Sequence, residues 1–239
     1  MLVIAGSDSS GGAGIARDLA TLAVLGVHAR YALTAITVQS AERVLAVHPL
    51  DAELVTAQIA AGLAAGAPGA VKIGMLANAA IVRAVAAALP ARVPVVLDPV
   101  LAASSGGELL DAAGRAALPE LLPQVTLLTP NIPEAARLLG VAPAHDEAGL
   151  LAQARALLAL GPEAVLIKGG HGEGAEAIDL LVTSTHEPRR LCAPRRPGTR
   201  RGTGCALAAA IAAYLAQRLT LAESCARGKR HVSELFRKG

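Results

Sequence analysis

Residues 202–205, Gly-Thr-Gly-Cys, are the part of this sequence best suited to chemistry. Two glycines allow a tight turn that directs several backbone N–H groups toward one point. Residues 206–215 are almost all helix formers, so the turn is expected to open a helix whose first N–H groups have no helical partner. Because such a terminus also carries the positive end of the helix dipole, the segment predicts an anion-binding turn.

Cys205 stands at the start of this predicted helix, where the pKa of a thiol is expected to fall. An anion cradle with a base inside it is what phosphoryl transfer to a hydroxyl group requires. The alternative is that the turn only caps a buried helix and that Cys205 is a small core residue. These residues alone leave both interpretations open.

Polar side chains also follow several apolar runs that are expected to be strands. Asp98 and Glu134 could hold Mg²⁺ through their carboxylates, and Lys168 could reach a phosphate as a point charge. Each has a structural alternative. Asp98 could form a turn with the following proline, and Lys168 could be a solvated strand end. Asn131 and Glu134 have the spacing of a helix capping box.

The glycine-rich loop at residues 6–14 follows an expected strand and precedes an expected helix. It does not match G-x-G-x-x-G, and Gly12-Ala13 stands where a Walker loop requires Lys and Ser or Thr. The loop therefore predicts close backbone approach to a ligand without identifying that ligand.

Short β-branched runs alternate with Ala- and Leu-rich helical patterns along the whole chain. The expected strands are 2–5, 30–38, 71–74, 93–98, 125–129, 165–168 and 178–183. The expected helices lie near 13–26, 51–65, 78–89, 112–121, 132–139, 147–160, 204–218 and 220–236. This alternation predicts one α/β domain over 1–239, with a mostly parallel sheet covered by helices on both faces. Ligands of such sheets bind beyond the carboxyl ends of the strands, where the polar residues lie.

Composition excludes some classes of protein. The chain has 239 residues, 53% hydrophobic and 1% aromatic, with a net charge of +3. So few aromatic residues argue against single-stranded nucleic-acid binding, although basic residues concentrate after Pro188. Three cysteines without CxxC spacing fit a reduced, cytoplasmic protein. We find no signal peptide and no stretch long enough to span a membrane, so no membrane partner is expected.

Taken in order, these loops resemble the hydroxymethylpyrimidine and phosphomethylpyrimidine kinases, within the ribokinase-like superfamily. The resemblance covers nearly the whole chain. The matching stretches are 5–15, 38–39, 71–76, 97–100, 129–134, 165–171 and 202–205. Cys205 is typical of this branch, because sugar kinases of the superfamily carry Asp at that place.

The resemblance implies a single-domain, three-layer ribokinase-like sandwich that uses ATP and Mg²⁺ to phosphorylate a hydroxymethylpyrimidine, and its monophosphate, for thiamine biosynthesis. It also implies a homodimer. The implied catalytic residues are Gly202, Thr203, Gly204 and Cys205, with Cys205 as the base. The implied pyrimidine pocket consists of Gly6, Ala13, Asp18, Gln39 and Met75. Asn131 and Lys168 would bind the nucleotide, and Asp98 and Glu134 the metal.

The chain departs from the family pattern where Thr199-Arg200-Arg201 replaces the usual Asn-Thr-His, and it stops soon after its last helix. These departures concern phosphate contacts and substrate range. Two alternatives remain: a pyridoxal or pyridoxine kinase of the same superfamily, and a non-catalytic pyrimidine-binding paralogue that acts as a sensor or partner subunit.

Overall fold

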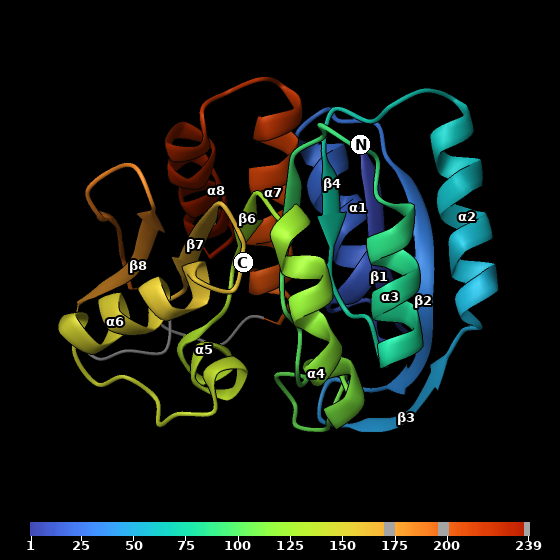
Figure 1. The fold of residues 1–239 in the computed structure, drawn as a ribbon, viewed down its shortest axis with the longest axis horizontal. Helices are drawn as coiled ribbons and strands as arrows, with labels where there is room; N and C mark the ends of the chain where they lie inside the picture. The colour runs from blue at the N-terminus through green and yellow to red at the C-terminus, as the bar shows by residue number, and fades with distance from the viewer. Residues whose placement is uncertain (170–174, 196–200, 237–239) are drawn as a thin grey trace.

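A computed structural model describes residues 1–169, 175–195 and 201–236. Within them, one nine-stranded sheet runs in the order β3-β2-β1-β4-β5-β6-β7-β8-β9 (Figure 1). The strands are β1 (Leu2–Asp8), β2 (Arg30–Gln39), β3 (Val44–Pro49), β4 (Val71–Ile73), β5 (Val95–Leu97), β6 (Leu127–Leu128), β7 (Ala164–Ile167), β8 (Glu176–Thr183) and β9 (Arg189–Pro194).

The middle of the sheet is parallel. β1 pairs in parallel with β2 and β4, and parallel pairing continues through β5 and β6 to β7. Among the described strands, the antiparallel pairs are β2 with β3, β7 with β8 and β8 with β9. The parallel strands therefore end at one edge of the sheet, as the sequence predicted.

Helices cover both faces of this sheet. They are α1 (Gly14–Val24), α2 (Ala52–Ala64), α3 (Ala79–Ala88), α4 (Ala112–Leu121), α5 (Ile132–Leu139), α6 (Glu147–Leu158), α7 (Thr203–Ala216) and α8 (Leu221–Leu235), with a 3₁₀ turn, η1, at Leu122–Gln124. One core lies between the sheet and α1, α7 and α8, and the second lies between the sheet and α2 to α6. In Figure 1, α3 and α4 lie in front of the sheet and α1 behind it. The predicted three-layer sandwich is confirmed.

Most helices begin at a polar side chain that caps the first turn. Asn78 accepts a hydrogen bond from the N–H of Ile81, Asp111 from Gly114 and Asp146 from Gly149. By contrast, α1 begins after Ala13 and α7 after Gly202, without a side-chain cap. The first N–H groups of α1 and α7 are therefore not taken up by capping side chains.

All seven expected strands and all eight expected helices are present, but β3 and β9 were not predicted. Both are edge strands with many partly or fully exposed residues, so neither carries the apolar signature of a buried strand. In the part of the chain that the structure describes, we find no helix with the length and apolar character needed to cross a bilayer.

Candidate active site

A cavity of about 1080 Å³ opens at the carboxyl ends of the parallel strands. Its walls come from the loops after β1, β4, β5 and β6, from β2, and from the first turn of α7. It brings together all but one of the residues predicted for the site: Gly6, Ala13, Gln39, Met75, Asp98, Asn131, Glu134, Lys168, Gly202, Thr203, Gly204 and Cys205.

The anion-binding turn lies against the glycine-rich loop. Gly202 has φ 72°, and a Cβ there would lie 2.2 Å from the carbonyl oxygen of Gly12. The N–H of Ala206 donates to Gly202 O, so the N–H groups of residues 203–205 have no acceptor within the helix. A Cβ on Gly204 would lie 3.1 Å from Lys168 Nζ, so the turn also approaches the charged residues closely. The turn therefore presents N–H groups without a helical acceptor, as the prediction of an anion-binding turn requires.

Cys205 is partly buried and lines the cavity, whereas Cys225 is fully buried in the core. The pKa of Cys205 is raised to about 11, mainly by burial and in addition by the nearby Asp18 and Asp98 carboxylates. The Lys72 ammonium and a hydrogen bond from the Gly14 backbone oppose this rise in pKa. The predicted fall in the thiol pKa is therefore wrong for this structure, because desolvation outweighs the Lys72 charge and the Gly14 hydrogen bond.

Asp98, Glu134 and Lys168 form a compact charged cluster on the cavity wall. Lys168 Nζ lies 2.6 Å from Asp98 Oδ1 and 3.8 Å from Glu134 Oε2. Burial raises the pKa of Glu134 to about 7; Lys168 opposes the rise, and the Asp98 charge adds to it. Although burial opposes it, the two carboxylates raise the pKa of Lys168. The cluster thus has more buried negative charge than one ammonium compensates.

Asn131 and Glu134 also form the helix capping box that the alternative interpretation predicts. The Asn131 side chain accepts from the N–H of Glu134 at 2.8 Å, and Glu134 Oε2 accepts from the N–H of Asn131 at 2.7 Å. Because Glu134 also lines the cavity, it serves the helix and remains available to a ligand. One side chain therefore fits both interpretations.

These carboxylates fit a magnesium ion shared with phosphate oxygens. Within the described ranges, no three His, Cys, Asp or Glu side chains gather to enclose a metal. Mg²⁺ is commonly held by one or two carboxylates together with water and nucleotide phosphates. Asp98 and Glu134, with their excess of buried negative charge, would provide the protein part of such a set.

Asp18 does not line the cavity, and the prediction that it contacts the substrate is wrong for this structure. It is fully buried in α1, where its Oδ2 lies 2.7 Å from Lys72 Nζ. Burial raises the pKa of Asp18 to about 6, and Lys72 opposes that rise. Its partner Lys72 lines the cavity instead, and the sequence analysis did not predict Lys72 as a site residue. The available signal was a lysine inside the apolar run of β4, because a buried lysine requires a partner.

A second part of the cavity wall carries Gly6, Ala13, Gln39 and Met75. A Cβ on Gly6 would lie 2.7 Å from Met75 Sδ, so the glycine leaves room for the methionine. Gln39 is buried to 9% exposure at the end of β2. These four residues contribute apolar surface and one amide group, a combination typical of sites for small heterocycles.

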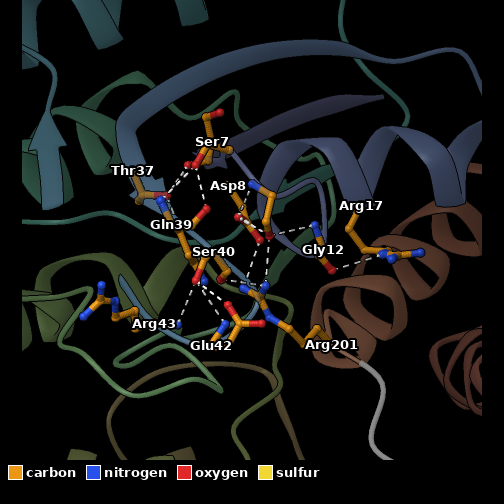
Figure 2. Close-up of polar contacts among 12 residues, drawn as sticks. Ser7, Asp8, Gly12, Arg17, Thr37, Gln39, Ser40, Glu42, Arg43 and Arg201 are labelled. Carbon is orange, nitrogen blue, oxygen red and sulfur yellow. Dashed lines mark hydrogen bonds and ion pairs between the residues drawn. The ribbon is translucent and has the colours of Figure 1, made fainter. Parts of the chain in front are cut away.

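Arg201, which directly precedes the anion-binding turn, contacts the ends of the loops after β1 and β2 (Figure 2). Its guanidinium donates to Ser10 Oγ at 2.9 Å, to Ser40 O at 3.0 Å and to Asp8 Oδ2 at 3.2 Å. The arginine that departs from the family pattern is therefore bound within the site. Thr199 and Arg200 lie outside the described residues.

The comparisons with known proteins agree with this geometry. A sequence model of the family described as phosphomethylpyrimidine kinase matches residues 8–239. The chain belongs to this family. A hydroxymethylpyrimidine/phosphomethylpyrimidine kinase of Rhizobium meliloti is 43% identical, over 97% of this chain and 88% of that protein. The same enzyme of Salmonella typhimurium is 46% identical, over 89% of this chain and 81% of that protein.

Solved structures of phosphomethylpyrimidine kinase and of pyridoxal kinase share the fold. The Clostridium difficile phosphomethylpyrimidine kinase has a TM-score of 0.84 and 36% identity, covering 98% of this chain and 97% of that one. A Staphylococcus aureus pyridoxal kinase in complex with AMP-PCP and pyridoxal has a TM-score of 0.86 and 31% identity, covering 97% and 85%. The predicted family, ribokinase-like fold and phosphotransferase class are confirmed, and kinases of this family use ATP as a substrate.

Proposed function

We propose that this phosphotransferase moves a phosphoryl group from ATP to the hydroxymethyl group of 4-amino-5-hydroxymethyl-2-methylpyrimidine, and then to the resulting monophosphate, for thiamine biosynthesis. One observation carries the proposal: the anion-binding turn and Cys205 share a cavity with a wall that offers a single amide, that of Gln39. The family and the names of the relatives support the same substrate.

In this proposal the N–H groups of residues 203–205 stabilise charge on the transferring phosphoryl group. Lys168 neutralises charge beside that turn, as the short distance from its Nζ to the place of a Gly204 Cβ suggests. Cys205 accepts the proton of the substrate hydroxyl group, and Lys72 favours the thiolate that this step needs.

Asp98 and Glu134 would hold Mg²⁺, which supplies neutralisation of phosphate charge when it is bound. Asn131 keeps Glu134 oriented through the capping box. Glu134 must be ionised to hold the cation, and a bound cation would favour that ionised form.

An ADP-release assay tests the proposal on three acceptors: the pyrimidine alcohol, its monophosphate and pyridoxal. We expect ADP release with the first two that depends on added Mg²⁺. Release with pyridoxal alone would contradict the proposal and favour the pyridoxal kinase alternative, which the Staphylococcus aureus structure supports through its similarity. Calorimetric binding of the pyrimidine without ADP release would favour the non-catalytic alternative.

We also propose that the protein is a homodimer that pairs through the outer face of β2 and β3. Ile36 and Val38 are 49% and 45% exposed, and Leu45 on β3 is exposed beside them. On β2 they alternate with Thr37 and Gln39, which line the cavity. The same strand would then form the substrate wall with one face and the subunit contact with the other.

A further inference from the structure

Gln39 is held at its backbone by Ser9. Its N–H donates to Ser9 Oγ at 2.8 Å, and the same hydroxyl donates to Gln39 O at 2.9 Å. The main chain at the end of β2 is therefore fixed relative to the loop after β1. What remains to be set is the orientation of the side-chain amide.

The hydroxyl of Thr37 lies next to this amide (Figure 2). Thr37 is buried to 2% exposure, and its Oγ1 lies 2.8 Å from Ser7 O and 3.3 Å from Gln39 Oε1. A hydroxyl group has one hydrogen to donate and lone pairs to accept with. If that hydrogen goes to Ser7 O, the nearer acceptor, two oxygens without a hydrogen between them face each other at 3.3 Å.

Rotating the amide by half a turn removes this conflict, since the two orientations of a glutamine amide differ only in the exchange of nitrogen and oxygen. We propose that Nε2 of Gln39 donates to Thr37 Oγ1 and that Oε1 is the amide atom presented to the cavity. Thr37 is then a positioning residue that determines specificity, because it makes the cavity-facing atom a hydrogen-bond acceptor. This inference rests on the proposed function only for the identity of the ligand.

An acceptor at this place selects between the two candidate substrates. The 4-amino group of the pyrimidine alcohol donates N–H bonds and complements Oε1. Pyridoxal carries a ring hydroxyl that ionises readily, and the resulting oxygen anion would face Oε1 without a hydrogen between them. A site that presents a hydrogen-bond acceptor disfavours a ligand that has no donor at the same position.

Kinetics of Thr37→Val and Thr37→Ser test the selectivity. Valine preserves the shape but removes the acceptor, so the amide is free to rotate. We expect its KM for the pyrimidine alcohol to rise about tenfold with a smaller change in kcat, as for loss of one oriented hydrogen bond. The ratio of kcat/KM for the pyrimidine alcohol over pyridoxal should fall by a similar factor, and serine should restore it to within about twofold. An unchanged ratio in the valine variant, or serine behaving as valine, would overturn the proposal.

Neutron diffraction from deuterated crystals of the unaltered protein tests the orientation itself, even if the valine variant fails to fold. Deuterium on the amide atom nearest Thr37 supports the proposal, and deuterium on the cavity-facing atom refutes it. This readout needs no turnover. A protein that phosphorylates neither acceptor would therefore disprove the proposed function while the neutron map still decides the role of Thr37.

Discussion

The thiol of Cys205 lies close enough to Lys72, Asp18 and Asp98 for each of their charges to act on its pKa. Burial dominates and keeps the thiol protonated at neutral pH, with a pKa of about 11. A base must be ionised to accept a proton, so only a small fraction of the protein carries the reactive thiolate. Because the thiolate fraction rises about tenfold per pH unit below the pKa, activity should rise with it.

Replacing Cys205 tests this role. Cys205→Ala should lower kcat by about 10²- to 10⁴-fold, as expected for loss of a general base, with little change in melting temperature. The unaltered protein should show kcat/KM increasing between about pH 7 and pH 9, and the variant should lose that dependence. Cys192→Ala, at an exposed cysteine, is the matched control and should keep normal turnover. Near-normal activity of Cys205→Ala would remove the thiol from the mechanism.

We expect the ionised carboxylate of Glu134, the form that would bind a metal, to lower the free energy of unfolding. Burial raises its pKa from 4.5 to about 7, so the folded state binds its proton more tightly than the unfolded state. Its contribution to stability is present below about pH 4.5 and is lost as the pH rises through 7. At pH 8 the ionised side chain therefore destabilises the folded protein.

Glu134→Gln should then raise the melting temperature at pH 8 by several degrees, for a gain on the order of 1–3 kcal/mol, while abolishing Mg²⁺-dependent turnover. Glutamine keeps the carbonyl oxygen that the capping box needs. The gain should disappear well below pH 4.5, at about pH 3, where glutamate is protonated in both states. Glu120→Gln, in an exposed ion pair, is the control, and thermal unfolding at the two pH values is the measurement. Equal stability of parent and variant at pH 8 would contradict the argument.

At the scale of elements, the site depends on how α7 begins. The turn before it places Gly202 against the carbonyl of Gly12, so two glycine-rich segments from distant parts of the chain touch through their backbones. This contact holds the N–H groups of residues 203–205 beside the cavity wall. A side chain cannot enter without moving one of the two segments.

Gly202→Ala should therefore reduce kcat at least about tenfold and lower the melting temperature, because its Cβ would clash with Gly12 O in addition to backbone strain of about 1–2 kcal/mol. Gly140→Ala is the matched control. Gly140 has φ 67°, close to the 72° of Gly202, but a Cβ there would meet nothing within 4 Å. It should lose a similar amount of stability from strain and keep full turnover. Steady-state kinetics beside thermal unfolding would show the difference, and equal loss of turnover in both variants would contradict it.

Much of this arrangement could be predicted from the sequence because it is local. Apolar runs such as that of β5 predict buried strands, and the polar residues that follow them meet at one edge in any parallel sheet. The edge strands β3 and β9 lack that signal. The pairing of Asp18 with Lys72, 54 residues apart, and of Asp8 with Arg201, 193 residues apart, depends on the final packing and has no local pattern. Desolvation of Cys205 likewise depends on what covers it, so the sign of its pKa shift could not be predicted.

At the scale of the whole molecule, the outer face of β2 and β3 is the surface that a second copy would cover. Val38→Asp should split the proposed dimer into monomers, because a charge buried between two apolar faces has no partner. Sedimentation velocity would measure the oligomeric state. The KM for the pyrimidine should also rise, because Val38 lies between Thr37 and Gln39, which line the cavity. Val141→Asp changes an exposed valine beyond α5 and should leave the mass and the KM unaltered. A parent protein that sediments as a monomer would refute the dimer.

The contact between Gly12 and Gly202 also bears on how the protein is made. During translation, the loop after β1 leaves the ribosome long before the turn that completes the phosphate cradle. A nascent chain stalled before residue 202 has the strands of the sheet but no α7, so under the proposed mechanism it would not transfer phosphate. Catalytic competence should thus appear abruptly, late in synthesis.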